Sequence, residues 1–207
     1  RQLFPKHERN KWAEAATLVA DYRFRRRPRR YPRRDLDASQ VFATLGESVR
    51  SPLLLEAIKT WLDRLDKGGG LAQFQVKSAE RILAGLEARS CTGTLVSAGT
   101  GSGKTLAFYL PALSWLAAQR VQAPGTRGVR VLALYPRNEL LKDQLAEVYG
   151  QCRKFDSLIT RQGGRPLRVG VLYGDTPTKA AKALDKRSWP YHPQGKRVPF
   201  FNCPDDS

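Results

Sequence analysis

The stretch Ala98-Gly99-Thr100-Gly101-Ser102-Gly103-Lys104-Thr105 decides the fold, because it has the pattern of a loop that holds phosphate groups. Glycine adopts positive φ angles at little cost, so the glycines at 99, 101 and 103 allow successive N–H groups to turn inward around an anion. Lys104 supplies a positive charge for the β- and γ-phosphates, and Thr105 supplies a hydroxyl ligand for Mg²⁺. The stretch therefore predicts a site for a nucleoside triphosphate and its magnesium ion.

The residues on either side of this loop have the required context. Residues 93–97 are apolar and β-branched, as in a short buried strand, and an apolar run typical of a helix extends from Leu106 to Leu116. The strict pattern has glycine where this chain has Ala98, so the match is to the A-x-x-G-x-G-K-T variant. A strand, a phosphate loop and a helix in this order are expected, rather than an ordinary glycine-rich turn.

Two further strands are predicted downstream, each followed by a helix. Residues 129–135 form an apolar run that ends at Pro136, and Asn138 is placed to cap a helix after it. A third strand is expected over 167–173, followed by a helix over 179–184. Alternating strands and helices predict an α/β fold with a three-layer parallel sheet, whose strands end beside the phosphate loop.

The sequence before the loop has a helical and arginine-rich character. Helices are predicted over 10–22, from Ser51-Pro52 to the glycines at 68–70, and over 72–88. Between residues 23 and 34, eight of twelve positions are arginine, and Pro28 and Pro32 rule out a continuous helix. Two interpretations remain open: an extended arm along a phosphate backbone, with Phe24 and Tyr31 stacking on bases, or a solvated linker held by acidic residues elsewhere. In the first, the contacts come from Arg25, Arg26, Arg27, Arg29 and Arg30.

The composition favours a polyanionic partner. The 207 residues carry 36 Lys and Arg against 19 Asp and Glu, which gives a formal net charge of +17 and indicates a nucleic acid. The three cysteines form no C-x-x-C pair, so neither a disulfide framework nor a complete zinc site is expected, although Cys203 could begin a metal site. There is no long apolar run, so we expect a cytoplasmic protein with no membrane partner.

The chain contains no methionine, which is what we expect of a piece of a longer protein. Three parts are predicted: a helical, Arg-rich extension over 1–70, a nucleotide-binding lobe over 71–187, and an irregular tail over 188–207. No acidic D-E-x-[HD] pattern follows a strand, although such a pattern would hold Mg²⁺ and position the attacking water. Alone, these residues are therefore expected to bind nucleotide weakly and to hydrolyse it negligibly.

Three motifs together resemble those of superfamily 2 helicases of the DEAD/DEAH-box type, over roughly 71–184. Residues 98–105 resemble motif I, Tyr135-Pro136-Arg137-Asn138-Glu139-Leu140 resembles motif Ia, and Tyr173-Gly174-Asp175-Thr176 resembles the G-D-T element that follows the next strand. Phe74-Gln75 stands where these helicases carry a glutamine that contacts adenine. The Y-P-x-N-x-L-x-x-D-Q form over 135–144 is similar to large DNA helicases of repair and phage defence, including the Hrq-type branch.

The resemblance implies a RecA-like lobe with ATP and Mg²⁺ as cofactors. Gly99, Thr100, Gly101, Ser102, Gly103, Lys104 and Thr105 would bind ATP, with Lys104 and Thr105 in the catalytic role, Thr105 on the Mg²⁺ and Gln75 on the adenine. Pro136, Arg137, Asn138, Gly174, Asp175 and Thr176 would contact the phosphates of one nucleic-acid strand. Asn138 and Thr176 could instead simply cap their helices, or do both.

The resemblance also implies the partners. These are DNA in preference to RNA, a second RecA-like lobe in the remainder of the protein, and other subunits of a bacterial defence or repair complex. Two other functions remain open: a P-loop kinase or GTPase, which lacks support because nothing resembles N-K-x-D, and a nucleic-acid-binding interaction module whose ATP site regulates assembly.

Overall fold

The computed structural model describes residues 31–65, 69–99, 101–172, 191–192 and 195–196. The elements in this part are α1 (Ala38–Ser48), α2 (Pro52–Leu62), α3 (Gln73–Glu87), α4 (Lys104–Gln122), α5 (Asn138–Arg153), α6 (Asp156–Arg161), β1 (Tyr191–His192) and β2 (Gly195–Lys196). The two short strands pair in antiparallel register. The helices predicted over 10–22 and 179–184 lie outside the described residues.

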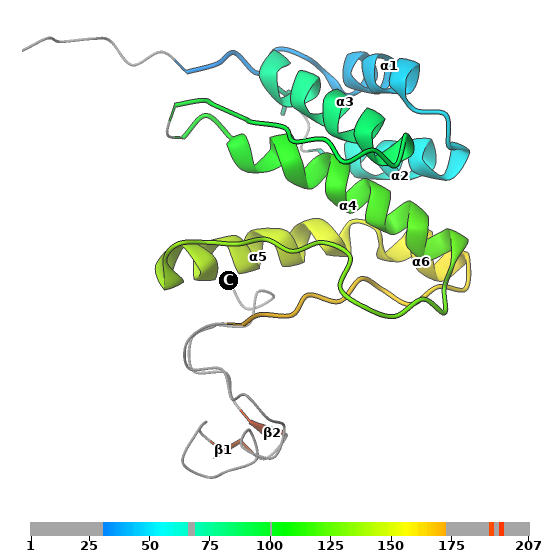
Figure 1. Cartoon of the computed structure of the whole chain (residues 1–207), viewed down its shortest axis with the longest axis vertical. Helices are drawn as coiled ribbons and strands as arrows, with labels where there is room; N and C mark the ends of the chain where they lie inside the picture. The colour runs from blue at the N-terminus through cyan, green and yellow to red at the C-terminus, as the bar shows by residue number, and fades with distance from the viewer. Residues whose placement is uncertain (1–30, 66–68, 100, 173–190, 193–194, 197–207) are drawn as a thin grey trace, which may run out of the picture. The chain divides into compact units, whose positions relative to one another are not determined.

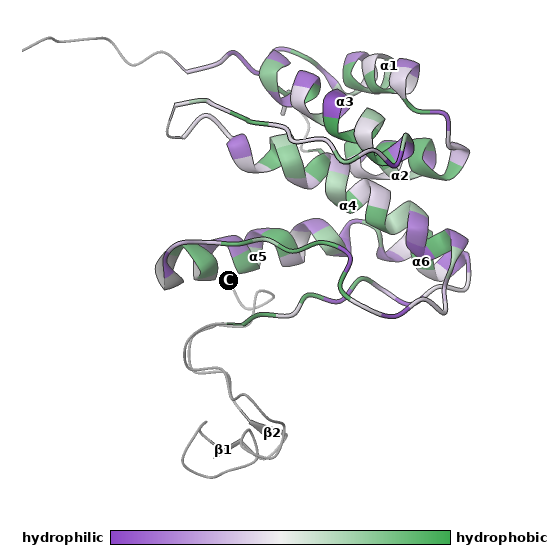
Figure 2. Cartoon of the chain, viewed as in Figure 1, coloured by the Kyte–Doolittle hydropathy of each residue, from purple (hydrophilic) through white to green (hydrophobic). Residues whose placement is uncertain are grey.

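Helix α4 is the centre of the helical part. Figure 1 shows it between α2 and α3 on one side and α5 and α6 on the other. No residue from 104 to 121 is exposed, its buried residues include Ala107, Leu110, Leu113 and Ala117, and Figure 2 shows apolar residues along it. A helix that is apolar on every face is one that neighbours cover on every face. The helix that follows the phosphate loop is therefore held rigidly by its surroundings.

One hydrophobic core joins the helices before and after the loop. It includes Val41 of α1, Trp61 of α2, Leu83 of α3, Leu110 of α4 and Ile159 of α6, each with no exposed surface. Helices α1 and α2 lie in the stretch that the sequence assigned to an N-terminal extension, yet they pack on α3 and α4 in this shared core.

The helix starts have local causes. Ser51 is the N-cap of α2, where its hydroxyl accepts a hydrogen bond from the Leu54 N–H, and Pro52 occupies the first helical position. The predicted helices after Ser51 and over 72–88 are thus confirmed. Helix α1 was not predicted, although Asp37 and Gln40 form a capping box at its start.

The predicted parallel sheet is not formed within the described residues. Residues 91–99, 129–135 and 164–172 lie outside helices, as the strand predictions require, but they do not pair with one another. Large apolar side chains on them stay exposed: Leu95 at 95%, Leu134 at 82% and Leu172 at 82%. A strand forms only when its backbone groups pair with those of a neighbouring strand, and such a neighbour cannot be identified from an apolar run alone.

Candidate nucleotide site

The phosphate loop has the backbone that its glycines predict. Gly101 and Gly103 adopt φ angles of 77° and 84°, in the left-handed region that favours glycine. The Ser102 N–H bonds to the Gly99 carbonyl at 3.3 Å, which closes a tight turn. Gly103 is the N-cap of α4, and Lys104 and Thr105 are its first two residues. The loop therefore presents the positive end of a 19-residue helix, which is suited to an anion.

Three features of the loop fit a phosphate ligand. The Ser102 hydroxyl is buried and has no hydrogen-bond partner among the described residues. Lys104 directs its Nζ to the carbonyls of Ala98 and Gly99, at 2.6 and 3.0 Å, so its ammonium lies over the loop. Gly103 has a φ of 84°, so any other residue there would be strained, and a β-carbon would lie 2.7 Å from the end of another side chain. ATP would supply the anion, and Thr105 would bind the Mg²⁺ that ATP carries. Both assignments remain predictions. The assignment of Thr100 also remains a prediction, because this residue lies outside the described ones.

Gln75 fixes the loop to the start of α3. Its side chain is 1% exposed, with Oε1 accepting the Ala72 N–H at 2.8 Å and Nε2 donating to the Gly103 carbonyl at 2.7 Å. The first bond caps α3, and the second holds the residue before Lys104. A glutamine amide has two N–H groups and two lone pairs, so each end keeps one further bond. The adenine contact thus stays a prediction, and the structure adds a positioning role that the sequence did not indicate.

The segment that resembles motif Ia is joined to α4 by two tyrosines. The hydroxyl of Tyr109 in α4 is hydrogen-bonded to that of Tyr135, at the end of the extended segment before α5. Burial, and then this hydrogen bond, raises the pKa of Tyr109 well above its usual value, so this hydroxyl stays protonated at neutral pH. Figure 1 shows α4 and α5 beginning on the same side of the helical part. The two candidate loops are thereby mechanically connected.

The predicted nucleic-acid contacts are described only in part. Pro136 and Arg137 are exposed. Arg137, not Asn138 as predicted, occupies the N-cap position of α5, and Asn138 is the first helical residue. Since the cap residue makes no side-chain hydrogen bond, helix α5 begins without the expected asparagine cap. Gly174, Asp175, Thr176, Arg25, Arg26, Arg27, Arg29, Arg30 and Cys203 lie outside the described residues.

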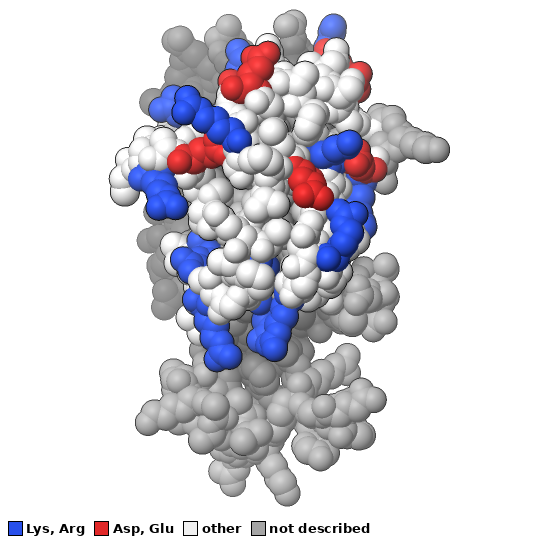
Figure 3. Space-filling view, turned by 90° about the vertical axis from the view of Figure 1, so that its right-hand side faces the viewer, with Lys and Arg blue, Asp and Glu red and all other residues white. Residues whose placement is uncertain are grey.

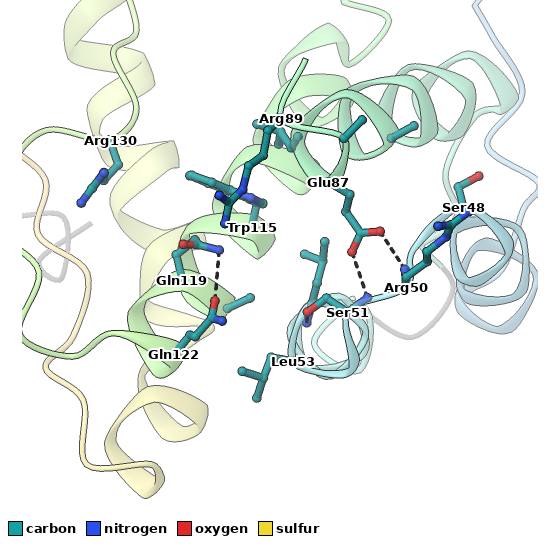
Figure 4. Close-up of a pocket in the computed structure, with 15 residues that line it drawn as sticks. Ser48, Arg50, Ser51, Leu53, Glu87, Arg89, Trp115, Gln119, Gln122 and Arg130 are labelled. Atoms are coloured by element: carbon teal, nitrogen blue, oxygen red, sulfur yellow. Dashed lines mark hydrogen bonds between the residues drawn. The ribbon is translucent and has the colours of Figure 1, made fainter. Parts of the chain in front are cut away.

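A cavity of about 910 Å³ lies at the other end of α4 (Figure 4). Its lining includes Trp115 and Gln119 of α4, and Glu87 at the end of α3. The Glu87 carboxylate accepts hydrogen bonds from the backbone N–H groups of Arg50 and Ser51, at 2.8 and 2.9 Å. This cavity does not include the phosphate loop, and no motif of the sequence indicated it.

Comparison with known proteins identifies the family. The model of the DEAD/DEAH box helicase family matches residues 72–189, more than half of the chain. The chain belongs to this family. The sequence resemblance is confirmed, and family membership implies a RecA-like α/β fold although the described residues are mostly helical. No solved structure matches the chain significantly, and the described residues include no helix long and apolar enough to cross a membrane.

Individual relatives match only part of this DEAD/DEAH box chain. Druantia protein DruE of Escherichia coli (strain UMEA 4076-1) is 32% identical over 128 residues, which are 59% of this chain and 7% of DruE. ATP-dependent RNA helicase ddx46 of Dictyostelium discoideum is 38% identical over 77 residues, 37% of this chain and 6% of that protein. ATP-dependent RNA helicase mss116 of Aspergillus oryzae is 39% identical over 89 residues, 43% of this chain and 13% of that protein. The chain thus spans a small fraction of each relative.

Proposed function

We propose that the chain is the ATP-binding lobe of a motor that uses ATP hydrolysis to move along or unwind nucleic acid. The observation that carries this proposal is the hydrogen bond between Tyr109 and Tyr135, because it joins the helix of the phosphate loop to the motif Ia segment. A motor must couple its nucleotide site to its nucleic-acid site, and this bond directly connects the helix of the phosphate loop to the motif Ia segment.

The nucleotide side of the proposal assigns a role to each loop residue. Backbone N–H groups of 99–105 and the start of α4 hold the phosphates, Lys104 neutralises them, and Thr105 binds the Mg²⁺. ATP supplies the γ-phosphate, whose presence or loss selects between loop arrangements. Within the lobe over 71–187, the extended segments become strands of a three-layer parallel sheet. A second RecA-like lobe, in the remainder of the protein, supplies the residues for hydrolysis.

The nucleic-acid side rests on charge and on the motif Ia segment. The net charge of +17 suits a polyanion, and Figure 3 shows Lys and Arg side chains on one face of the described part, interspersed with Asp and Glu. Pro136, Arg137 and Asn138, with Gly174, Asp175 and Thr176, contact phosphates of one strand, so they hold the track without reading its sequence. The Arg-rich residues 25–30 add further phosphate contacts.

DNA is the proposed track. The Y-P-x-N-x-L-x-x-D-Q form over 135–144, which resembles that of large DNA helicases, supports it. We further propose a cytoplasmic role in a bacterial defence or repair complex. The names of the matched RNA helicases make RNA the competing track.

The test measures the ATPase of the intact protein with DNA, with RNA and with neither. We expect DNA to stimulate hydrolysis and Lys104→Ala to reduce it at least about a hundredfold, since a preorganised charged group is worth several kcal/mol in a phosphoryl transfer site. Arg81→Ala, an exposed change on α3, serves as the control. If only RNA stimulates the ATPase, the substrate is RNA and not DNA. Full ATPase activity in the Lys104→Ala variant would refute the nucleotide site. Nucleotide binding without stimulated hydrolysis would instead indicate a regulated interaction module.

A further inference from the structure

Arg34, the last arginine of the Arg-rich segment, lies against the phosphate loop. A β-carbon on Gly103 would meet Nη2 of Arg34 at 2.7 Å and Nε2 of Gln75 at 2.8 Å. The guanidinium and the Gln75 amide therefore both lie against Gly103, the N-cap of α4. These residues are far apart in the sequence, and the motifs of the loop gave no indication of Arg34.

The backbone of Arg34 is held in place by a short antiparallel bridge. Leu36 and Leu71 exchange two backbone hydrogen bonds, at 3.1 and 2.9 Å. Beside the bridge, a β-carbon on Gly70 would lie closer than 3.0 Å to the carbonyl oxygen of Arg34. Since real β-carbons do not approach a backbone oxygen so closely, glycine at 70 is what permits the contact. The position of Arg34 thus depends on the turn that leads into α3.

The charge of Arg34 is available for an anion. The side chain is exposed, and no carboxylate of a described residue forms an ion pair with it. The positive end of α4 lies beside it, and the Lys104 ammonium of the same loop faces the carbonyls of Ala98 and Gly99. The loop thus has three positive groups around it, and its buried Ser102 hydroxyl has no partner among the described residues. Such a cluster is unfavourable by itself and becomes favourable once an anion joins it.

We propose that Arg34 binds a phosphate group of the nucleoside triphosphate in the loop. This inference rests on the proposed function, because it requires a nucleotide at residues 98–105. A guanidinium suits the role, since its planar fork can donate two parallel hydrogen bonds to phosphate oxygens. Arg34 thereby belongs to the nucleotide site, whereas the arginines at 25–30 are proposed to bind nucleic acid.

The test compares the affinity of the intact protein for ATP, ADP and adenosine by competition with a fluorescent nucleotide. A hydrogen bond to a charged group contributes roughly 10- to 100-fold in affinity when buried, but an exposed pair contributes less, so we expect Arg34→Ala to weaken ATP binding about two- to fivefold. Adenosine affinity should not change, and Arg34→Lys should recover part of the loss. Arg33→Ala is the matched control and should leave all three ligands unaffected.

The salt dependence of ATP binding provides a second readout. The affinity for ATP should fall less steeply with salt in Arg34→Ala than in the unchanged protein, and Arg33→Ala should not change this dependence. An equal loss for adenosine and ATP would place the guanidinium on the base and overturn the proposal, as would unchanged ATP affinity. Lys104→Ala separates the two levels of inference. If the unchanged protein does not bind ATP, the proposed function fails. If it binds ATP, and Lys104→Ala weakens the binding while Arg34→Ala does not, only the role of Arg34 is refuted.

A variant that leaves the guanidinium intact gives an independent check. Gly70→Ala introduces the β-carbon that would strike the Arg34 carbonyl, so it should displace Arg34 and reproduce its loss of ATP affinity. Gly125→Ala is the control, because a β-carbon there meets no atom within 4 Å. If Gly70→Ala folds with native thermal stability and binds ATP as tightly as the unchanged protein, the bridge does not position Arg34 and the proposal fails.

Discussion

Tyr109 and Tyr135 share a hydrogen bond between their hydroxyl groups, one from the middle of a rigid helix and the other from the end of an unpaired extended segment. Tyr109 is 3% exposed, and its helix begins at the phosphate loop. Tyr135 directly precedes Pro136 and Arg137. Any movement of α4 that follows a change at the loop therefore acts first on this bond.

Removing either hydroxyl should weaken the coupling between ATP and nucleic acid. We expect Tyr109→Phe and Tyr135→Phe each to reduce the effect of ATP on DNA affinity about three- to tenfold, because one hydrogen bond contributes about 1 kcal/mol. The double variant should be no worse than either single one, since both remove the same bond. Tyr149→Phe on α5 is the control. Additive losses in the two single variants would contradict the shared bond.

Glu87 should stabilise the start of α2. Its carboxylate accepts the N–H groups of Arg50 and Ser51 from the end of α3, so Glu87→Ala removes two hydrogen bonds to a charged group. We expect the free energy of unfolding in urea to fall by about 1–2 kcal/mol. Glu47→Ala, an exposed glutamate on α1, should change it by less than about 0.5 kcal/mol. Equal effects of the two changes would show that the Glu87 bonds contribute nothing.

The thiol of Cys152 should be protected from alkylation while that of Cys91 reacts. Burial raises the pKa of Cys152 to about 11. The nearby Arg153 lowers this pKa and Asp156 raises it, but burial is the largest effect. Cys91 is exposed. In a Cys203→Ser background at pH 8, iodoacetamide should therefore modify Cys91 at least about tenfold faster, because only the thiolate reacts. Similar rates at both cysteines, measured by peptide mass spectrometry, would disprove the burial of Cys152.

The same thiol should make the fold less stable in alkali. Its pKa is raised on folding, so the stability contribution is complete below pH 9, where the unfolded thiol is also protonated, and is lost between about pH 9 and 11. The expected loss is about 3 kcal/mol, because the pKa rises from 9.0 to about 11 on folding and one pKa unit corresponds to about 1.4 kcal/mol. Cys152→Ala should remove this part of the pH dependence. An unchanged slope in that variant would assign the alkaline loss to other groups.

The arginines at 25–30 should set the salt dependence of DNA binding. If they bind phosphates, replacing Arg25, Arg26, Arg27, Arg29 and Arg30 with glutamine should lower the slope of log K against log[salt] by about 0.7–0.9 for each phosphate that is no longer neutralised. The single control Arg81→Gln should change the slope by less than about 0.7. An unchanged slope in the arginine variant would favour the linker interpretation.

The sequence was most informative where a local pattern has one physical solution. Three glycines before a lysine predicted the loop, and two of them, Gly101 and Gly103, adopt positive φ. Ser51 followed by Pro52 predicted the start of α2. In both places the backbone itself requires the residue type, so neighbouring residues suffice for the prediction.

Contacts between distant parts of the chain were not predictable in this way. Neither the role of Gln75 in holding Gly103 nor the place of Arg34 beside it follows from a pattern, because 28 residues separate the first pair and the second depends on the bridge between Leu36 and Leu71. Strand pairing is non-local for the same reason. Residues 129–135 lie outside helices, as a strand requires, but they form no strand within the described residues.

The unpaired segments also bear on the order in which this protein folds. The helices around α4 have their caps and a shared core, so they can form from contacts already within these residues. Residues 91–99, 129–135 and 164–172, with Leu95, Leu134 and Leu172 exposed, would pair later, because strand pairing is non-local. Assembly on the ribosome would then begin with a helical platform and complete the sheet last. Before the sheet is complete, neighbouring nascent chains would associate through the unpaired strand edges, and a chaperone would be needed to prevent this.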